Sequence, residues 1–478
     1  MLWFSALAMS VAAGWFLARG MTAGSFSGPR WASLVCELSL GAFFGPGIAS
    51  ILFLPLVSTG AATQIGVFAT LAALLGLSAA IWWKLTPAAT PSRPFKKFSW
   101  TWALWICAAA ALIFLVLDFQ AAANANPYGE WDAMAIWNLR ARLLASGGNL
   151  WHRAVSSEIG GQMTGAAHPG YPLFLSGFLA LQWIAAGTTT SGWEQSVPIA
   201  VTLLVSLSSL ALLVTSLATR KSISLGVLAG LILLTSEVFA SQVSAEYSDL
   251  LQGFAFLATL VLLDAAVDSD SLRIVVAVGL AAGLAAWIKN EGLPFSIAAL
   301  AVAAWRLRSR GLQWLAIGAA PGLAAVGVLK LFLAQGRDSV LPAGLGDALA
   351  KVTEAGRWWQ AGLGFGKAVY DAGGVLTHPV VLAAILAFAL RFIPASARKE
   401  KLWLWIPIAV TAAAEYGLYL VTEANLDWHI STSVSRLVAQ LWPSLIWVFF
   451  LQLRAPEELV EIAPVRVPIR RTQKRARA

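Results

Sequence analysis

Long runs of apolar residues follow one another along most of the chain, and they predict membrane-spanning helices. A helix needs about 20 apolar residues to cross the hydrocarbon layer of a bilayer, and only helices and closed barrels satisfy their own backbone there. The runs lack the period-2 alternation of a transmembrane barrel. We therefore predict an all-α, polytopic membrane protein with thirteen crossings, at residues 2–18, 31–57, 64–83, 100–118, 196–217, 222–240, 249–267, 273–288, 293–305, 312–333, 373–391, 402–421 and 437–453.

Composition supports the same class of protein. Hydrophobic residues make up 58% of the chain and charged residues only 12%, whereas soluble domains carry roughly 25% charged residues. These values exclude a soluble enzyme, a disordered protein and a nucleic-acid-binding module. The net charge of +9 is explained by the basic residues that gather in the cytoplasmic loops of membrane proteins.

One further apolar stretch, residues 171–187, determines the predicted topology. If it does not cross, the basic residues collect on one side of the membrane, as the positive-inside rule requires. If it crosses, every downstream loop changes side and the basic tail lies outside. We favour an interfacial or re-entrant helix, which places the N-terminus outside and these groups inside: Arg19 and Arg30, the segments 84–97, 220–221, 306–310 and 398–401, and the tail.

This topology divides the chain into four regions. The N-terminal helices occupy residues 1–123, and an external loop with interfacial helices and candidate catalytic acids follows at 124–195. A transmembrane bundle with a second external loop, 334–372, occupies 196–453. A basic cytoplasmic tail ends the chain at 454–478.

The first of five polar segments is NPYGEWDAMAIWNLRARLL, residues 126–144. A helical wheel starting at Asp132 predicts an amphipathic helix on the outer leaflet, with Arg140 and Arg142 flanking its apolar stripe. Glu130 and Asp132 are two residues apart, so in an extended lead-in they point to the same side. Paired carboxylates divide acid–base work or share a metal; the structural alternative is that acids stabilise a helix start.

Four more polar segments each contain candidate site residues, and each also has a structural explanation. The explanations are a structural histidine, helix N-capping, a local ion pair and a packed polar interface between helices. The topology nevertheless places all five segments on the external face, which favours one shared site. The candidates are His168 and Tyr171 in HPGYP, Glu246 and Asp249 in SAEYSD, Lys289 and Glu291 in IKNEG, and Asp427, His429 and Arg436 in the last segment, 425–443. In this last segment, one helical face is shared by His429, Ser433, Arg436 and Gln440.

The order and spacing of these segments resemble a known class of enzymes. GEWDAMAIWNLRARLL, HPGYPLFLSGFLAL, AEYSDLLQGFAFLATL, KNEG and DWHISTSVSR resemble the GT-C class of integral-membrane glycosyltransferases, of the protein O-mannosyltransferase and aminoarabinose-lipid A transferase type. The resemblance covers most of 124–300 and again 425–443. It implies a bacterial cytoplasmic-membrane enzyme with a periplasmic active site, a polyprenyl-phosphate-linked sugar as donor and a glycan, lipid or protein as acceptor.

The resemblance also implies roles for individual residues. An acid after a transmembrane helix, at the start of the first large external loop, is the base in that class, and Asp132 or Glu130 occupies this position. The sequence has Glu-Trp-Asp where relatives often carry Asp-Glu or Asp-x-Asp, so the choice between the two stays open. The donor phosphate would be bound by Arg142, Lys289 and Arg436, and the sugar or acceptor by Asn138, Arg140, His168, Tyr171, Glu246, Asp249, Glu291, Asp427 and His429.

The expected reaction inverts the configuration at the anomeric carbon. No spacing requires a metal, although Glu130 and Asp132 would be the ligands of a divalent cation such as Mg²⁺ or Mn²⁺. The alternatives are a transporter or flippase for lipid-linked sugars, a ligase that uses a similar donor, and a scaffold without chemistry. A transporter would usually show internal repeats and broken helices at the midplane, and the sequence shows neither.

Overall fold

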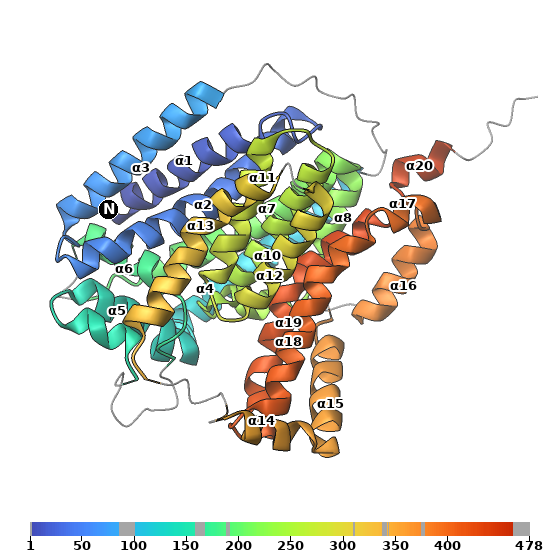
Figure 1. Ribbon diagram of the computed structural model, residues 1–478. Coiled ribbons are helices and arrows are strands. Elements are labelled where there is room, and N and C mark those ends of the chain that lie inside the picture. Colours follow the sequence, from blue (N-terminus) through green and yellow to red (C-terminus); the bar gives the residue numbers. More distant parts are fainter. Residues whose placement is uncertain are drawn as a thin grey trace, which may run out of the picture.

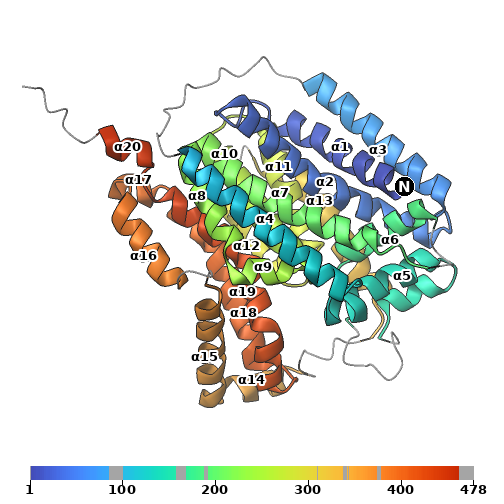
Figure 2. The ribbon, with the colours of Figure 1, turned by 180° about the vertical axis from the view of Figure 1, so that it is seen from behind.

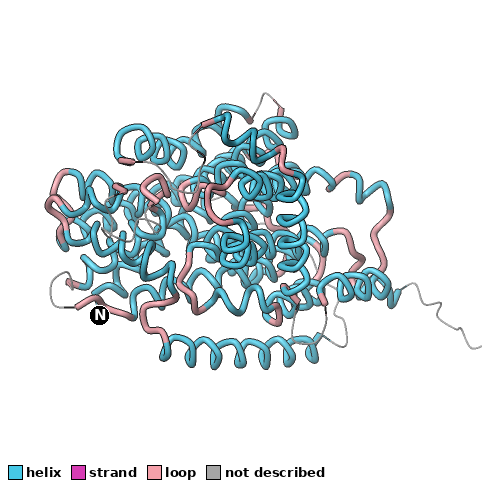
Figure 3. The backbone as a smooth tube through the Cα atoms, turned by 90° about the horizontal axis from the view of Figure 1, so that it is seen from below, coloured by secondary structure: helices cyan, strands magenta, loops and turns pink. Residues whose placement is uncertain are grey.

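The protein is a bundle of helices, as the apolar runs predict (Figure 1). The computed structural model describes residues 2–85, 101–157, 168–187, 192–308, 311–336, 342, 344–373 and 378–461. Within these ranges the elements are all helical (Figure 3), and the only β-pairing consists of two isolated bridges. The prediction of an all-α chain is therefore confirmed for the described residues.

Nine helical segments in the described part of the chain are long and apolar enough to cross a membrane. They make the protein a polytopic membrane protein by length and composition. These segments are α1 (Leu2–Thr22), α2 (Arg30–Ser58), α3 (Gln64–Leu85), α4 (Thr101–Ala125), α7 (Ser196–Arg220), α10 (Ser248–Val267), α13 (Leu312–Val328) with the π-helical turn η4 (Leu329–Leu333), the segment Ala395–Val421, and α19 (Leu426–Leu451). Ala395–Val421 comprises α17 (Ala395–Lys399), η5 (Leu402–Leu404) and α18 (Trp405–Val421).

Four of the thirteen predicted crossings coincide with shorter helices, so the number thirteen stays a prediction. The run 222–240 is interrupted: α8 (Ile223–Leu234) ends before Thr235, and the separate helix α9 (Glu237–Val243) follows Ser236. The other three correspond to α11 (Leu272–Ala286), α12 (Gly292–Leu307) and α16 (Pro379–Leu390). At about 1.5 Å per residue, each is shorter than the roughly 30 Å of hydrocarbon.

The stretch that decides the topology forms α6 (Phe174–Ala186), a helix of 13 residues. Its length of about 20 Å fits a segment that enters the bilayer without crossing it. Nearly every residue of α6 is buried, and the helix packs against α1, α2, α3 and α7. It is therefore an internal element of the bundle and does not lie on its lipid surface.

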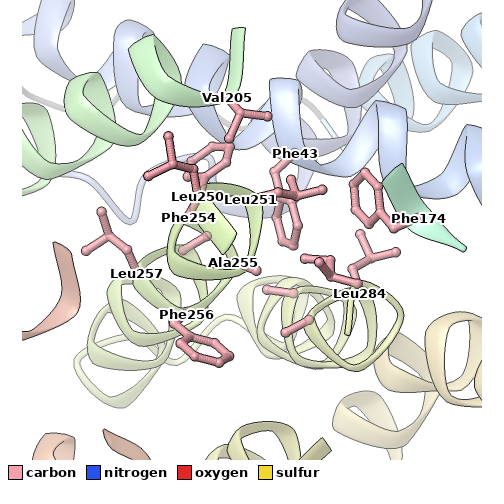
Figure 4. Packing of buried hydrophobic residues seen from close by; sticks show 14 of the residues in the cluster. Phe43, Phe174, Val205, Leu250, Leu251, Phe254, Ala255, Phe256, Leu257 and Leu284 are labelled. Carbon is pink, nitrogen blue, oxygen red and sulfur yellow. The ribbon is translucent and has the colours of Figure 1, made fainter. Parts of the chain in front are cut away.

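Helix α10 forms the centre of the hydrophobic core, because its residues are buried on all sides. Phe254 of α10 lies 5.6 Å from the Phe43 ring of α2, and Phe43 stacks on Phe174 of α6 at 5.9 Å. Figure 4 shows Phe43 between Phe254 and Phe174, with Leu284 of α11 below. Close packing on every side fixes α10, and it fixes the polar residues at the N-terminus of this helix with it.

The polar segments gather at the end of the bundle opposite α20 (Pro456–Glu461) (Figures 1 and 2). The predicted first loop contains the π-helical turn η1 (Ala133–Trp137), α5 (Asn138–Ser146) and the short helix η2 (Leu150–Val155). The predicted second loop contains α14 (Leu345–Val352) and α15 (Ala355–Asp371), which pack against α18.

Helices α1 and α2 approach each other through glycines. A Cβ atom at Gly14 would lie 2.1 Å from the carbonyl oxygen of Gly41 and 2.4 Å from the nitrogen of Gly45. Small residues allow such close backbone contact between membrane helices. The pair α1–α2 therefore depends on the absence of side chains at this crossing.

We expect Gly14→Ala to destabilise the protein, because overpacking of this kind costs about 1–3 kcal/mol. The matched control is Gly76→Ala in α3, where a Cβ would meet no atom within 4 Å. The melting temperature of each variant in detergent micelles tests this expectation. Equal melting temperatures for the two variants would contradict the close packing of α1 on α2.

Candidate functional site

The first and third polar segments contact each other directly. The backbone N–H of Glu130 donates to the carbonyl oxygen of Ala245 over 3.2 Å. The Tyr247 hydroxyl donates to Glu130 Oε2 over 3.4 Å and accepts the backbone N–H of Asp132 over 3.3 Å. The turn that precedes α10 therefore fixes the position of both candidate catalytic acids.

An ion pair joins the segment that precedes η1 to α19. The Arg436 guanidinium of α19 donates to the Asp132 carboxylate, and its carbon lies 5.1 Å from the centre of the Tyr247 ring. Both partners keep 17% of their side-chain surface exposed. The pair therefore lies at the boundary of the protein interior, where a ligand can reach it.

A second ion pair lies deeper, at the N-terminus of α10. Lys289 Nζ donates to Asp249 Oδ1 over 3.0 Å and also lies 3.1 Å from Glu291 Oε1, while Gln440 Nε2 of α19 donates to Asp249 over 2.7 Å. Asp249 and Lys289 are both buried, and buried charges require such partners. Asp132, Arg436, Asp249, Lys289 and Glu291 are hereafter called the charge cluster.

Electrostatics keeps Lys289 protonated. Burial by itself would lower the pKa of Lys289, but the nearby carboxylates of Asp249 and Glu291 raise it above its ordinary value. A protonated ammonium group is what an anionic ligand requires. The charge cluster therefore offers two permanent cations, Arg436 and Lys289.

Several buried polar atoms of the charge cluster have no hydrogen-bond partner among the described residues. They are Arg436 Nε, Asp249 Oδ2 and Glu291 Oε2, together with Oε1 of the neighbouring Gln440. Most buried polar atoms in proteins are hydrogen-bonded, and exceptions commonly mark functional positions or bound water. Their concentration here supports a site that takes a polar ligand.

Glu246 occupies a constrained position beside the acids. Its backbone has φ of +59°, a left-handed conformation that is unfavourable for a residue with a side chain. Its Oε2 accepts from Asn138 Nδ2 over 2.9 Å. Burial raises the pKa of Glu246 to about 7, although the Asn138 hydrogen bond and the charge of Arg142 oppose the rise.

Arg140 has a structural role in the interior of the protein. Its guanidinium is buried and donates to the carbonyl oxygens of Ala154 and Tyr171, over 2.7 and 2.8 Å. The predicted outer-leaflet helix, with Arg140 flanking its apolar stripe, is therefore wrong in this detail. The π-helical turn η1 changes the register after Asp132, and Arg140 joins the buried face that packs on α6 and η2.

Arg142 lies apart from the two other predicted phosphate-binding residues. Its guanidinium carbon lies 5.0 Å from the ring centre of Tyr128, 5.9 Å from that of Trp183 and 5.8 Å from that of Trp193. This aromatic surrounding holds the arginine beside Glu246. Only Arg436 and Lys289 of the three candidates belong to the charge cluster.

The remaining candidates form the surroundings of the cluster. His168 stacks on Tyr171 at 4.4 Å, and Tyr171 stacks on Trp137 at 5.7 Å. Asp427 is exposed and accepts from Gln360 of α15. His429 Nδ1 lies 3.1 Å from Thr422 Oγ1, at the C-terminal end of α18. The contacts of Asp427 and His429 are therefore with α15 and α18, and not with the charge cluster.

The predicted polar face of α19 does look toward protein. His429 contacts Thr422, and Ser433 Oγ lies 2.6 Å from the Tyr419 hydroxyl. Arg436 contacts Asp132 and Gln440 contacts Asp249. A polar helix face that runs into a membrane requires such partners.

Sequence reasoning did not single out three residues of this region. Tyr247 connects the two acids to Arg436, and Lys330 of η4 donates to Asn290 Oδ1 over 2.7 Å and to the carbonyl oxygen of Gly170 over 3.0 Å. Glu415 of α18 is buried near the charge cluster. Lys330 and Glu415 are each the lone charge in a predicted apolar run, a signal that could have identified them.

No group of three or more His, Cys, Asp or Glu side chains within the described ranges is arranged to hold a metal ion. Comparisons of the chain with protein-family models, with curated proteins and with solved structures give no match.

The raised pKa of Glu246 predicts a pH-dependent stability. The unfolded chain loses this proton near pH 4.5, whereas the folded protein keeps it up to about pH 7. Stability should therefore fall as the pH rises from 4.5 to 7, by about 2–3 kcal/mol, and stay level above that. Glu246→Gln, which keeps an acceptor for Asn138, should lose this component in melting temperatures measured between pH 5 and 8.

The exposed acid Glu354 offers a matched control, since Glu354→Gln should retain the wild-type pH dependence. An equally steep fall in stability for Glu246→Gln would show that another group is responsible.

Proposed function

We propose that the protein is a membrane glycosyltransferase. It transfers a sugar from a polyprenyl-phosphate carrier to an acceptor hydroxyl on the external face of a bacterial cytoplasmic membrane, with inversion at the anomeric carbon. The observation that supports this function best is the pairing of Asp132 with Arg436 beside the Asp249–Lys289 pair. It brings a candidate base and two cations for a phosphate into one cluster.

Asp132 is the base of the proposed reaction. It takes the proton of the acceptor hydroxyl as the acceptor oxygen bonds to the anomeric carbon, and the bond from that carbon to the carrier phosphate oxygen breaks. General-base assistance contributes about 10²–10⁴-fold. Glu130, which the Tyr247 hydroxyl contacts, is the alternative base, and the two acids are close enough to the same tyrosine for either role.

Arg436 and Lys289 stabilise the leaving phosphate. A guanidinium group binds phosphate through two parallel hydrogen bonds, and Nε of Arg436 has no partner among the described residues. A phosphate that draws Arg436 toward itself would free the Asp132 carboxylate to contact the acceptor hydroxyl.

The other predicted site residues support this arrangement. Asp249 and Glu291 hold Lys289, and Asn138 with Glu246 fixes the turn behind the acids. His168 and Tyr171 line the neighbouring loop. Because Arg436 and Lys289 supply positive charge, the proposed reaction proceeds without a divalent cation.

The position of the charge cluster favours an enzyme over a transporter. Asp249 lies in the first turn of α10, and Lys289 and Glu291 lie between α11 and α12. These are the ends of helices, whereas transporters bind their substrates near the membrane midplane. The acceptor in this proposal is a glycan, a lipid or a protein that reaches the external face.

The base assignment can be tested by Asp132→Asn and, separately, Glu130→Gln. Purified protein in proteoliposomes would receive radiolabelled undecaprenyl-phosphate sugars and membrane extract as acceptor. We expect Asp132→Asn to lose about 10²–10⁴-fold in the transfer rate and Glu130→Gln to lose less. Glu354→Gln, which neutralises an exposed acid at the N-terminus of α15, should transfer at the wild-type rate.

Two results would contradict the proposal at different levels. If neither variant loses at least about tenfold, the base is neither of these acids. If the wild-type protein transfers no sugar from any carrier tested, the proposed activity itself is wrong.

A further inference from the structure

Helix α18 carries a buried acid that neither the sequence prediction nor the proposed reaction uses. Glu415 keeps only 3% of its surface exposed. Neither of its carboxylate oxygens has a hydrogen-bond partner among the described residues. Burial of an unpaired carboxylate costs several kcal/mol, so its retention at this position requires an explanation.

Glu415 faces the charge cluster. Its charge interacts with those of Glu291, Lys289 and Asp249, and α18 packs along α12, which begins directly after Glu291. Asp249 Oδ2 and Glu291 Oε2 also lack partners there. Unpaired carboxylate oxygens from three separate elements therefore approach the same region.

The unpaired polar atoms of this region are mainly hydrogen-bond acceptors. Asp249 Oδ2 and Glu291 Oε2 belong to carboxylates that are paired with Lys289, so they accept hydrogen bonds. Gln440 Oε1 is also an unpartnered acceptor, and its amide nitrogen is already bound to Asp249. The single cation, Lys289, is shared by Asp249 and Glu291. The part of a ligand that reaches these unpaired oxygens must supply hydrogen-bond donors.

We infer that Glu415, with Asp249 and Glu291, binds the sugar end of the donor through its hydroxyl groups or through an amine. This inference rests on the proposed function and extends it with a sugar-binding residue. Arg436, on the Asp132 side of the cluster, then holds the carrier phosphate together with Lys289. The donor is oriented by charge: its anionic part binds beside Arg436, and its donor-rich part binds beside Glu415.

The test separates binding of the sugar from binding of the carrier. Wild-type protein, Glu415→Gln and the control Glu354→Gln would be placed in nanodiscs. Tryptophan fluorescence would be titrated with undecaprenyl phosphate and with its mannosyl, glucosyl, galactosyl and glucosaminyl forms. The glucosaminyl form adds an amine, which distinguishes ammonium recognition from hydroxyl recognition.

We expect the wild-type protein and Glu354→Gln to bind at least one sugar form more tightly than the bare carrier. Glu415→Gln should lose about tenfold in affinity for that form, as expected for a hydrogen bond to a charged group, and should bind the bare carrier unchanged. If Glu415→Gln does not yield monodisperse protein, Glu415→Asp, which withdraws the carboxylate by one carbon, should show the same selective loss.

The outcomes are distinguishable. A wild-type preference for a sugar form that survives in Glu415→Gln, or in Glu415→Asp where that variant replaces it, overturns the inference and leaves the proposed function intact. Equal loss of bare-carrier and sugar-form affinity also overturns it, because Glu415 would then act on the fold. A wild-type protein that transfers no sugar and binds every sugar form like the bare carrier contradicts the proposed function, and the inference fails with it.

Discussion

The ion pair between Asp132 and Arg436 is the interaction on which the arrangement of the site depends. Its partners are 304 positions apart in the sequence, one directly before η1 and the other in α19. Tyr247 lies under the guanidinium and contacts both candidate acids. A single contact therefore holds together the loop, the turn before α10 and α19.

The surrounding charges follow from the cost of placing ions in a low dielectric. Lys289 is tolerated in the interior because Asp249 and Glu291 flank it, and Asp249 gains a further hydrogen bond from Gln440. Glu415 has no such compensation within the described residues. The charge cluster therefore combines paired charges with unpaired acceptor atoms, as the proposed binding of a polar ligand requires.

The sequence predicted the helical architecture and the segments that form the site, because both depend on local patterns. Apolar runs located α2, α3 and α7 to within three residues at both ends, and the polar segments near the ends of such runs identified Asp132, Asp249, Lys289 and Arg436. Long-range partners were not predictable, because nothing in a local pattern pairs Asp132 with Arg436. The buried position of Arg140 was missed for a related reason: the π-helical turn η1 shifts the register of the helix that a regular wheel assumes.

The central claim is that the charge cluster binds the phosphate of a lipid-linked donor, and an experimental structure with such a lipid tests it most directly. The measurement is a cryo-electron microscopy map of the protein in nanodiscs with an undecaprenyl-phosphate sugar. We expect the phosphate within hydrogen-bond distance of Arg436 and Lys289, with Arg436 drawn away from Asp132. A phosphate bound elsewhere, with the Asp132–Arg436 pair intact, would contradict this account.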